Sequence, residues 1–265
     1  MEIFEKDDHC LIWGDAIQVL ENHINDDSID LIFADPPYNI GKNFQGTKDK
    51  WNSEQAYLKW CYHWLDLCIK KLKPHGSMYV MTATQYMPYI DIFLREKMTV
   101  LSRIIWHYDS SGVQAKKYFG SLYEPILFAV KNKNHYTFNA EDIMIEAKTG
   151  SVRKLIDYRK SKPTFYNTEK VPGNVWYFPR VRYKMPEYKN HPTQKPEVLL
   201  ERIIKASSHI DDVILDPFGG SFTTSKVAQK LKRKSISIEI EKAYIEIGLQ
   251  RLDMAEYDQE QMYFY

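Results

Sequence analysis

Residues 28–38, SIDLIFADPPY, constrain the fold of this chain more than any other stretch, because they predict a short strand that is apolar on both faces. Such a strand is typical of a parallel sheet with helices on its two sides, since only there are both faces buried. A second apolar stretch, DVILDPF at residues 212–218, also runs into an aspartate followed by proline. We therefore expect a chain built around a covered parallel sheet.

Strands and helices alternate along most of the 265 residues. Helices are predicted at residues 53–72, 87–98, 197–208, 221–231 and 243–254, and further strands at residues 9–16, 76–82, 100–108, 124–131 and 234–240. Alternation of this kind predicts the α/β class, with a doubly wound, mostly parallel sheet covered on both faces. The length fits one large domain or a core with an insertion.

Composition excludes several classes of protein. A content of 44% hydrophobic and 27% charged residues is ordinary for a globular chain, and no apolar run approaches the roughly 20 residues of a membrane span. The start, MEIFEKDDHC, lacks the basic residues and apolar run of a signal peptide, and the three cysteines have no metal-ligand spacing. We expect a cytoplasmic protein with no membrane partner and no metal.

A glycine turn follows the second buried strand. The stretch ILDPFGGSFTTSKVA, residues 214–228, lacks both the Gly-Lys-Ser/Thr ending of a P-loop and the G-x-G-x-x-G dinucleotide pattern. Gly219 and Gly220 permit close approach of a ligand, and Asp216 could accept a cationic amine. Glu239 ends the next strand, where nucleotide-binding α/β folds bind ribose. An amine and a ribose without a pyrophosphate indicate S-adenosylmethionine; a structural turn with a surface glutamate is the alternative.

The Asp35-Pro36-Pro37-Tyr38 corner ends the first buried strand. Ligands of doubly wound sheets bind beyond the carboxyl ends of the strands, so this corner and the glycine turn can share one crevice. The prolines remove two N–H donors and leave the Pro36 carbonyl as an acceptor beside the Asp35 carboxylate. An exocyclic amine could donate one hydrogen to each, which points its lone pair at a methyl donor, while Tyr38 stacks on an unstacked base. The alternative is a rigid corner without catalytic use.

Residues 151–190 differ from the rest of the chain. They hold ten Lys and Arg against three acidic residues, with eight aromatic residues interleaved. Basic side chains attract phosphates, and aromatic rings can stack on bases. This pattern is compatible with nucleic-acid contact, and a solvated, loop-rich insertion is the alternative.

In this order, the motifs resemble the β class of bacterial amino-group DNA methyltransferases. They are GDA (14–16), DPPYNIGKNF (35–44), HPTQKP (191–196), DPFGGSFTT (216–224) and IEIEKAYIEIGLQRL (238–252). The resemblance covers nearly the whole chain and implies a circularly permuted, Rossmann-like methyltransferase fold, because the catalytic motif precedes the cofactor turn. Two middle stretches, YDSSGVQAKKYFGSLYEPIL and KVPGNVWYFPRVRY, resemble solitary adenine methyltransferases in particular.

The resemblance also implies roles for individual residues. The catalytic residues would be Asp35, Pro36, Pro37 and Tyr38. The residues that bind S-adenosylmethionine would be Asp15, Ala16, Thr193, Lys195, Asp216, Phe218, Gly219, Gly220, Ser221 and Glu239. Among these, Asp15 would accept from the cofactor's adenine amine, and Lys195 with Thr193 would face the methionine carboxylate, although Lys195 could also be a plain surface lysine. His191 is expected to be structural.

Further implications concern double-stranded DNA, the expected partner. Residues 39–51 would form a loop that closes over the flipped base, with an ordinary surface loop as the alternative. Trp106 or Tyr108 would stack on the second face of the base unless both lie in the core. The residues implied to contact DNA are Asn39, Lys42, Asn43, Arg153, Arg159, Arg180 and Arg182. The catalytic domain would comprise residues 1–130 and 191–265, and residues 131–190 would form an inserted target-recognition region.

The sequence leaves open which base and which class of substrate are methylated. In the family that the chain resembles, Asp at position 35 favours the N6 amine of adenine and Ser favours the N4 amine of cytosine, so N4 stays possible. Methylation at cytosine C5 is disfavoured because no Pro-Cys dipeptide is present. An RNA or protein-glutamine methyltransferase, and a non-catalytic nucleic-acid-binding module, are the competing classes. A homodimer is possible.

Overall fold

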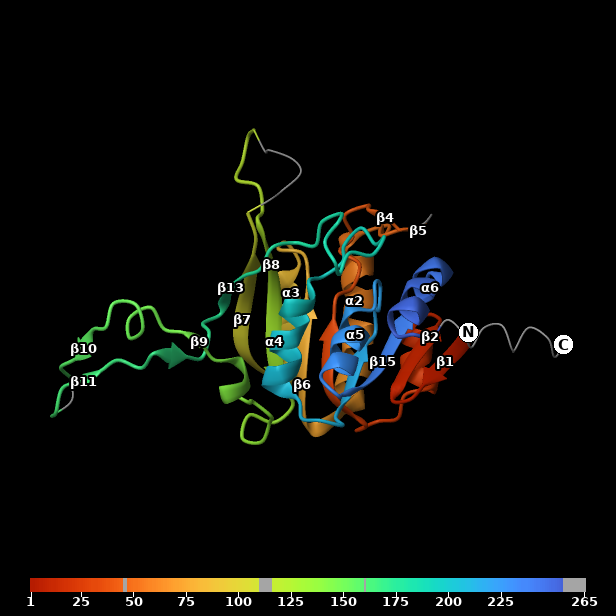
Figure 1. Ribbon diagram of the computed structural model, residues 1–265. Helices are drawn as coiled ribbons and strands as arrows, with labels where there is room; N and C mark the ends of the chain where they lie inside the picture. The colour runs from red at the N-terminus through yellow and green to blue at the C-terminus, as the bar shows by residue number, and fades with distance from the viewer. Residues whose placement is uncertain (45–46, 110–115, 160, 255–265) are drawn as a thin grey trace.

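The computed structural model describes residues 1–44, 47–109, 116–159 and 161–254 (Figure 1). Within these residues, a nine-stranded sheet has the order β1-β2-β15-β14-β3-β6-β8-β7-β13. Its strands are β1 (Glu2–Lys6), β2 (His9–Trp13), β3 (Ile29–Ala34), β6 (Leu72–Met81), β7 (Thr99–His107), β8 (Tyr123–Val130), β13 (Val175–Tyr177), β14 (Val213–Asp216) and β15 (Lys234–Glu239). Only β1 and β8 run antiparallel to their neighbours in this sheet, which confirms the mostly parallel arrangement.

The helices cover both faces of the sheet (Figure 1). They are α1 (Ala16–Asn22), α2 (Glu54–Lys71), α3 (Met87–Lys97), α4 (Glu197–Ser207), α5 (Thr223–Lys230) and α6 (Lys242–Arg251), with a short 3₁₀ turn, η1 (Glu141–Ile143). The helix predicted at residues 53–72 matches α2, whose first turn is capped by Ser53 accepting from the Ala56 N–H at 3.1 Å. The strand β1 and the helix α1 were not predicted.

The two-faced burial of β3 explains its apolar sequence. Ile32 and Ala34 pack with the helices α1, α2 and α3, whereas Leu31 and Phe33 pack with α4 and α5 on the other face. All four side chains are at most 2% exposed. Burying a large apolar side chain contributes about 1.5–3 kcal/mol, so the strand is held from both sides.

The chain reverses its direction of winding between β3 and β14. From β3 the chain passes through α2 to β6 on one side, and from β14 it passes through α5 to β15 on the other. The two strands are parallel neighbours, with Leu215 opposite Ile32. Their adjacency brings the Asp35 corner and the glycine turn to one end of the sheet, as a shared crevice requires. Open α/β sheets bind ligands at such a switch point, outside the carboxyl ends of the strands.

The region predicted to be an insertion leaves the body and returns to it (Figure 1). The pairs β9 (Ile145–Glu146) with β12 (Glu169–Lys170), and β10 (Ile156–Asp157) with β11 (Thr164–Phe165), form a projecting arm. The arm is anchored at both ends, since Asn139 donates to the carbonyls of Lys205 and Ser208 near α4, and β13 pairs with β7. In the part of the chain that the structure describes, no helix is long and apolar enough to span a membrane.

Candidate active site

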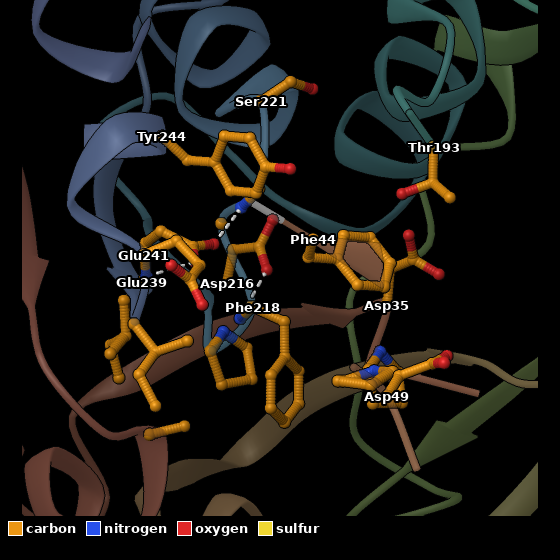
Figure 2. Close-up of a pocket in the computed structure, with 18 of the residues that line it drawn as sticks. Asp35, Phe44, Asp49, Thr193, Asp216, Phe218, Ser221, Glu239, Glu241 and Tyr244 are labelled. Carbon is orange, nitrogen blue, oxygen red and sulfur yellow. Dashed lines mark hydrogen bonds between the residues drawn. The ribbon is translucent and has the colours of Figure 1, made fainter. Parts of the chain in front are cut away.

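A pocket of about 350 Å³ opens at the carboxyl ends of β2, β3, β14 and β15 (Figure 2). This volume lies within the range of small-molecule sites. All the residues predicted to be catalytic or to bind the cofactor line it, together with Lys42 from the loop at residues 39–51 and His191 from the segment before α4. Figure 2 shows Asp216 and Glu239 on one side of the pocket and Asp35 and Thr193 on the other.

The glycine turn requires glycine at both positions. Gly220 has a φ of +52°, and a Cβ there would lie 3.1 Å from the His191 ring. A Cβ on Gly219 would lie 2.9 Å from the Phe222 ring. The Gly220 N–H donates to Glu239 Oε2 at 2.7 Å, which joins the turn to the end of β15. The turn therefore places the backbone of two residues without side chains next to the Glu239 carboxylate at the pocket wall.

Two buried carboxylates lie beside this turn. Asp216 accepts from the Thr224 hydroxyl at 2.5 Å and from the Phe218 N–H at 3.0 Å, and Glu239 also accepts from the Glu241 N–H at 2.8 Å. Burial raises the pKa of Asp216 and that of Glu239 to about 7 in spite of these hydrogen bonds. Buried acids of this kind favour a ligand that brings positive charge or hydroxyl donors.

Both oxygens of the Asp35 carboxylate have a partner at the other side of the pocket. Its Oδ1 accepts from the Tyr38 hydroxyl at 2.7 Å, and its Oδ2 lies 2.6 Å from Lys195 Nζ. Burial raises the pKa of Asp35, with Lys195 opposing the shift and Glu124 adding to it. Burial also raises the pKa of Tyr38 well above its ordinary value, so its hydroxyl keeps its proton and donates. The Pro37 carbonyl accepts from the Tyr57 hydroxyl at 2.8 Å, which holds the corner.

Lys195 is 7% exposed, so it is not a surface lysine. Its ammonium lies 2.6 Å from Asp35 and 3.4 Å from Glu124 Oε2. Burial alone would lower the pKa of Lys195, but the two carboxylates raise it, so the side chain stays charged. This contact with the Asp35 corner was not predicted; the contact of Lys195 and Thr193 with a methionine carboxylate stays a prediction.

The loop at residues 39–51 is tied to the Asp35 corner by Asp49. The buried Asp49 carboxylate accepts from the Tyr38 N–H at 3.2 Å and from the Lys42 N–H. Asn39 was predicted to contact DNA, but its amide donates to the Tyr86 hydroxyl at 2.9 Å and accepts from the Trp51 N–H at 3.0 Å. In this structure Asn39 therefore fastens the two ends of the loop.

The loop meets the segment around His191 across the pocket opening. Lys42 Nζ donates to the Pro192 carbonyl at 3.2 Å, and the ring of Phe44, on β4 (Asn43–Phe44), lies 6.1 Å from that of His191. Burial, followed by the charges of Lys195 and Lys42, lowers the pKa of His191 to about 3, so the ring is neutral. His191, expected to be structural, forms part of the pocket wall.

The two aromatic residues considered for the second face of the base lie in the same buried cluster. Trp106 is buried on β7, and its Nε1 donates to the Phe178 carbonyl at 2.9 Å. This position corresponds to the alternative that both residues lie in the core. The Tyr108 hydroxyl reaches Glu124 Oε1 at 3.4 Å, and the guanidinium of Arg180 lies 5.2 Å from the Tyr108 ring.

The basic residues predicted to contact DNA form two groups. Arg180 and Arg182 lie in the segment that returns from the arm to the pocket, and Arg182 is 3.6 Å from Asp109. Arg153 and Arg159 lie on the arm, where the Arg159 guanidinium binds Asp157 at 2.8 Å. The structure does not bring these two groups together (Figure 1).

Sequence reasoning missed two acidic residues that hold the Asp35 corner. Glu124 is the second residue of β8, and its Oε2 accepts from the Tyr38 hydroxyl at 3.1 Å. The only sequence signal was an acid at the start of an otherwise apolar strand. Asp49 lies in a polar loop without any distinguishing pattern. Within the described residues, no group of three or more His, Cys, Asp or Glu side chains is placed to hold a metal ion.

Comparison with known proteins agrees with this geometry. The chain is 57% identical over 252 residues to DNA adenine methyltransferase YhdJ of Escherichia coli K12, covering 95% of this chain and 85% of the relative. It is 38% identical to the type II methyltransferase M.HpaI of Haemophilus parainfluenzae, covering 93% and 74%. The stretches that resembled solitary adenine methyltransferases thus lie in a chain similar to YhdJ.

Solved structures show the same fold. The PvuII cytosine-N4-specific DNA methyltransferase matches with a TM-score of 0.71 at 21% identity, covering 93% of this chain and 86% of that one. The M1.HpyAVI complex with S-adenosylmethionine matches with a TM-score of 0.63 at 24% identity, covering 91% and 98%. The family described as N6_N4_Mtase, DNA methylase, matches residues 29–250. The chain therefore belongs to the N6/N4 DNA methylase family.

Proposed function

We propose that this protein transfers the methyl group of S-adenosylmethionine to the N6 amino group of adenine in double-stranded DNA. The observation that carries the proposal is that Asp35 and Asp216, which follow or end neighbouring strands, both line one pocket at the switch point of the sheet. One pocket can then hold a methyl donor and an amine acceptor next to each other.

The donor would occupy the half of the pocket formed by the glycine turn. Glu239 would accept from the ribose hydroxyls and Asp216 from the methionine ammonium, while the bare backbone of Gly219 and Gly220 lies against the cofactor. Asp15, whose Oδ1 caps α1 through the Gln18 N–H at 3.0 Å, would accept from the adenine amine of the cofactor. The Phe218 ring packs edge-on against Trp64 and so gives this half an apolar wall.

The acceptor would occupy the half formed by the Asp35 corner. The target amine would donate one hydrogen to Asp35 and one to the Pro36 carbonyl, which directs its lone pair at the sulfonium methyl. The lone pair forms the N–C bond as the C–S bond breaks, and the electron pair of that bond stays on sulfur as a thioether. The surplus proton passes from nitrogen to Asp35, whose pKa burial raises.

The target base would leave the duplex to reach this pocket, because a base within the stack cannot present its amine to the donor. Tyr38 would stack on the flipped base, and the loop at residues 39–51 would close over it. Lys42 and Asn43 of that loop would contact the DNA backbone.

Adenine is favoured over cytosine by Asp35 and by the similarity to a protein named as an adenine methyltransferase. The matching family comprises both N6 and N4 methylases, so the N4 product is the specific competitor.

The region at residues 131–190 would recognise the target sequence, with Arg153, Arg159, Arg180 and Arg182 contacting phosphates or guanine edges. Exposed apolar side chains on the arm, such as Val152 and Phe165, would support a homodimer, which light scattering of the purified protein tests. The enzyme would act in the cytoplasm, where bacterial DNA lies.

The test is incubation with labelled S-adenosylmethionine and unmethylated bacterial genomic DNA, followed by mass spectrometry of the nucleosides. We expect labelled N6-methyladenine, and its loss in the Asp35→Ala variant. Labelled N4-methylcytosine would keep the mechanism but overturn the base assignment. No labelled nucleoside from a protein that binds the cofactor would refute the proposal.

A further inference from the structure

Both oxygens of the Asp35 carboxylate already have a partner in this structure. Tyr38 donates to Oδ1 at 2.7 Å, and the Lys195 ammonium lies 2.6 Å from Oδ2. Each carboxylate oxygen can accept two hydrogen bonds, so a target amine can either join these partners or replace one of them. An amine that replaces Lys195 at Oδ2 leaves the ammonium in need of another acceptor.

A second carboxylate, that of Glu124, lies beside Lys195. Because β8 runs antiparallel to β6, and β6 runs parallel to β3, the first residues of β8 lie at the same end of the sheet as the carboxyl end of β3. Glu124, on this part of β8, has its Oε2 3.4 Å from Lys195 Nζ and 3.1 Å from the Tyr38 hydroxyl. The side chains of Asp35, Lys195 and Glu124 are 17%, 8% and 18% exposed, so water does little to replace a lost partner.

We infer that Glu124 is a positioning residue for methyl transfer, which takes over the Lys195 ammonium when the target amine binds Asp35. The inference rests on the proposed function and deepens it. Glu124 does not line the pocket, so it acts through Lys195 and Tyr38 and has no contact with the substrate. A buried ammonium that lost Asp35 without gaining another acceptor would be costly, and Glu124 removes that cost.

The net charge of the cluster formed by Asp35, Lys195 and Glu124 also supports this role of Glu124. Two carboxylates and one ammonium carry one net negative charge, and the target nitrogen becomes positive as the methyl group arrives. A negative surplus fixed before the reaction favours that change. With a neutral residue at position 124, the cluster would be neutral, and Lys195 would have Asp35 as its one carboxylate.

The test compares Glu124→Gln with wild type in single-turnover methylation at saturating S-adenosylmethionine and DNA. Glutamine keeps the shape and one acceptor oxygen but removes the charge and replaces the other oxygen with an amide donor. We expect the rate constant to fall about tenfold to a hundredfold, less than for a group that contacts the reacting atoms. The dissociation constants for cofactor and DNA, and the melting temperature, should not worsen, because an excess buried charge has been removed.

Two further variants separate positioning from support of the fold. Glu201→Gln removes a carboxylate on α4 that pairs with Lys205 outside the pocket, and it should keep a rate within about threefold of wild type. Glu124→Asp keeps the charge but withdraws it by one methylene, so its rate should lie between those of wild type and Glu124→Gln. This rescue by charge is not expected if Glu124 only fills space.

The measured rates and melting temperatures decide between positioning and support of the fold as the role of Glu124. A wild-type rate in Glu124→Gln, or a fall in rate matched by a fall in melting temperature and by an equal fall in Glu201→Gln, overturns the inference. If Glu124→Gln does not fold, a Glu124→Asp variant that folds and yet methylates at least about a hundredfold more slowly than wild type overturns it, because the retained charge has not rescued the rate. If the wild-type protein methylates no DNA, the proposed function fails and the inference fails with it; if wild type is active, only the role of Glu124 is at stake.

Discussion

At the scale of single residues, the site is a set of carboxylates in the pocket wall that favour a ligand with positive charge or hydrogen-bond donors. Asp35, Asp216 and Glu239 were predicted because the carboxyl ends of parallel strands meet at one edge of a sheet. Glu124 could not be predicted in the same way, since it comes from the amino end of an antiparallel strand, and the direction of β8 is set by tertiary pairing. Pairing of distant strands leaves no local pattern in the sequence.

Binding of S-adenosylmethionine should depend on pH through Asp216. Burial raises its pKa to about 7, so below that pH the carboxyl group is neutral and cannot attract the cofactor's ammonium. The apparent affinity should therefore rise about tenfold between pH 6 and pH 8, since one pKa unit corresponds to a factor of ten. Calorimetry across this range measures it. An Asp216→Asn variant should bind more weakly at pH 8 and show a flatter pH profile; an unchanged pH dependence in this variant would contradict the assignment.

Gly220→Ala should destabilise the turn. The new Cβ would meet the His191 ring at 3.1 Å, and the φ of +52° costs a side-chain-bearing residue about 1–2 kcal/mol. We expect a lower melting temperature and weaker cofactor binding. Gly173→Ala is the control, since nothing lies within 4 Å of its Cβ position. Equal melting temperatures for the two variants would show that the turn tolerates a side chain.

At the scale of elements, long periodic segments were predictable and short ones were not. The helix α2 has 18 residues and a serine cap, and its prediction was correct to within one residue at each end. The helix α1 has seven residues, which give too few turns to show a period, and Asp15, read as the end of a strand, is its cap. The strand β13 has three residues and is held by β7, so its place in the sheet could not be read from its sequence.

The loop at residues 39–51 should depend on Asp49 for its position. Asp49→Ala removes the acceptor of the Tyr38 and Lys42 N–H groups, and a buried donor without a partner costs about 1–3 kcal/mol. We expect faster proteolytic cleavage within this loop and slower methylation. The nearby Asn52→Ala variant changes an exposed residue outside both the pocket and this loop, and it should behave like wild type. Equal cleavage rates in the two variants would be inconsistent with an anchoring role.

At the scale of the whole molecule, the sheet and its helices carry the pocket and an arm projects from them, and we propose that the arm serves target recognition. The adjacency of β3 and β14 was predictable, because two acid-ended strands of one doubly wound sheet meet at its switch point. The path of the arm was not, because its two-residue ladders carry no hydrophobic period. Its charge was the one property that the sequence displayed.

Neutralising Arg153, Arg159, Arg180 and Arg182 together should weaken binding of duplex DNA. Each lost phosphate contact should reduce the slope of log affinity against log salt by about 0.9. Fluorescence anisotropy over a range of salt concentrations measures this slope. Lys232→Gln is a single-charge control, because this exposed lysine precedes β15, at the opposite end of that strand from the pocket. An unchanged DNA affinity and an unchanged salt slope in the variant with all four arginines replaced would show that neither the arm nor the segment returning from it contacts DNA.

The measurement that tests the account most directly compares cofactor binding with methylation in two variants of the same pocket. Asp35→Asn should bind S-adenosylmethionine like wild type and methylate adenine at least about 100-fold more slowly, because it changes the acceptor half alone. Glu239→Gln should bind the cofactor about tenfold or more weakly, because a charged acceptor of hydrogen bonds is lost. Loss of cofactor binding in Asp35→Asn, or wild-type binding in Glu239→Gln, would contradict the division of the pocket between donor and acceptor.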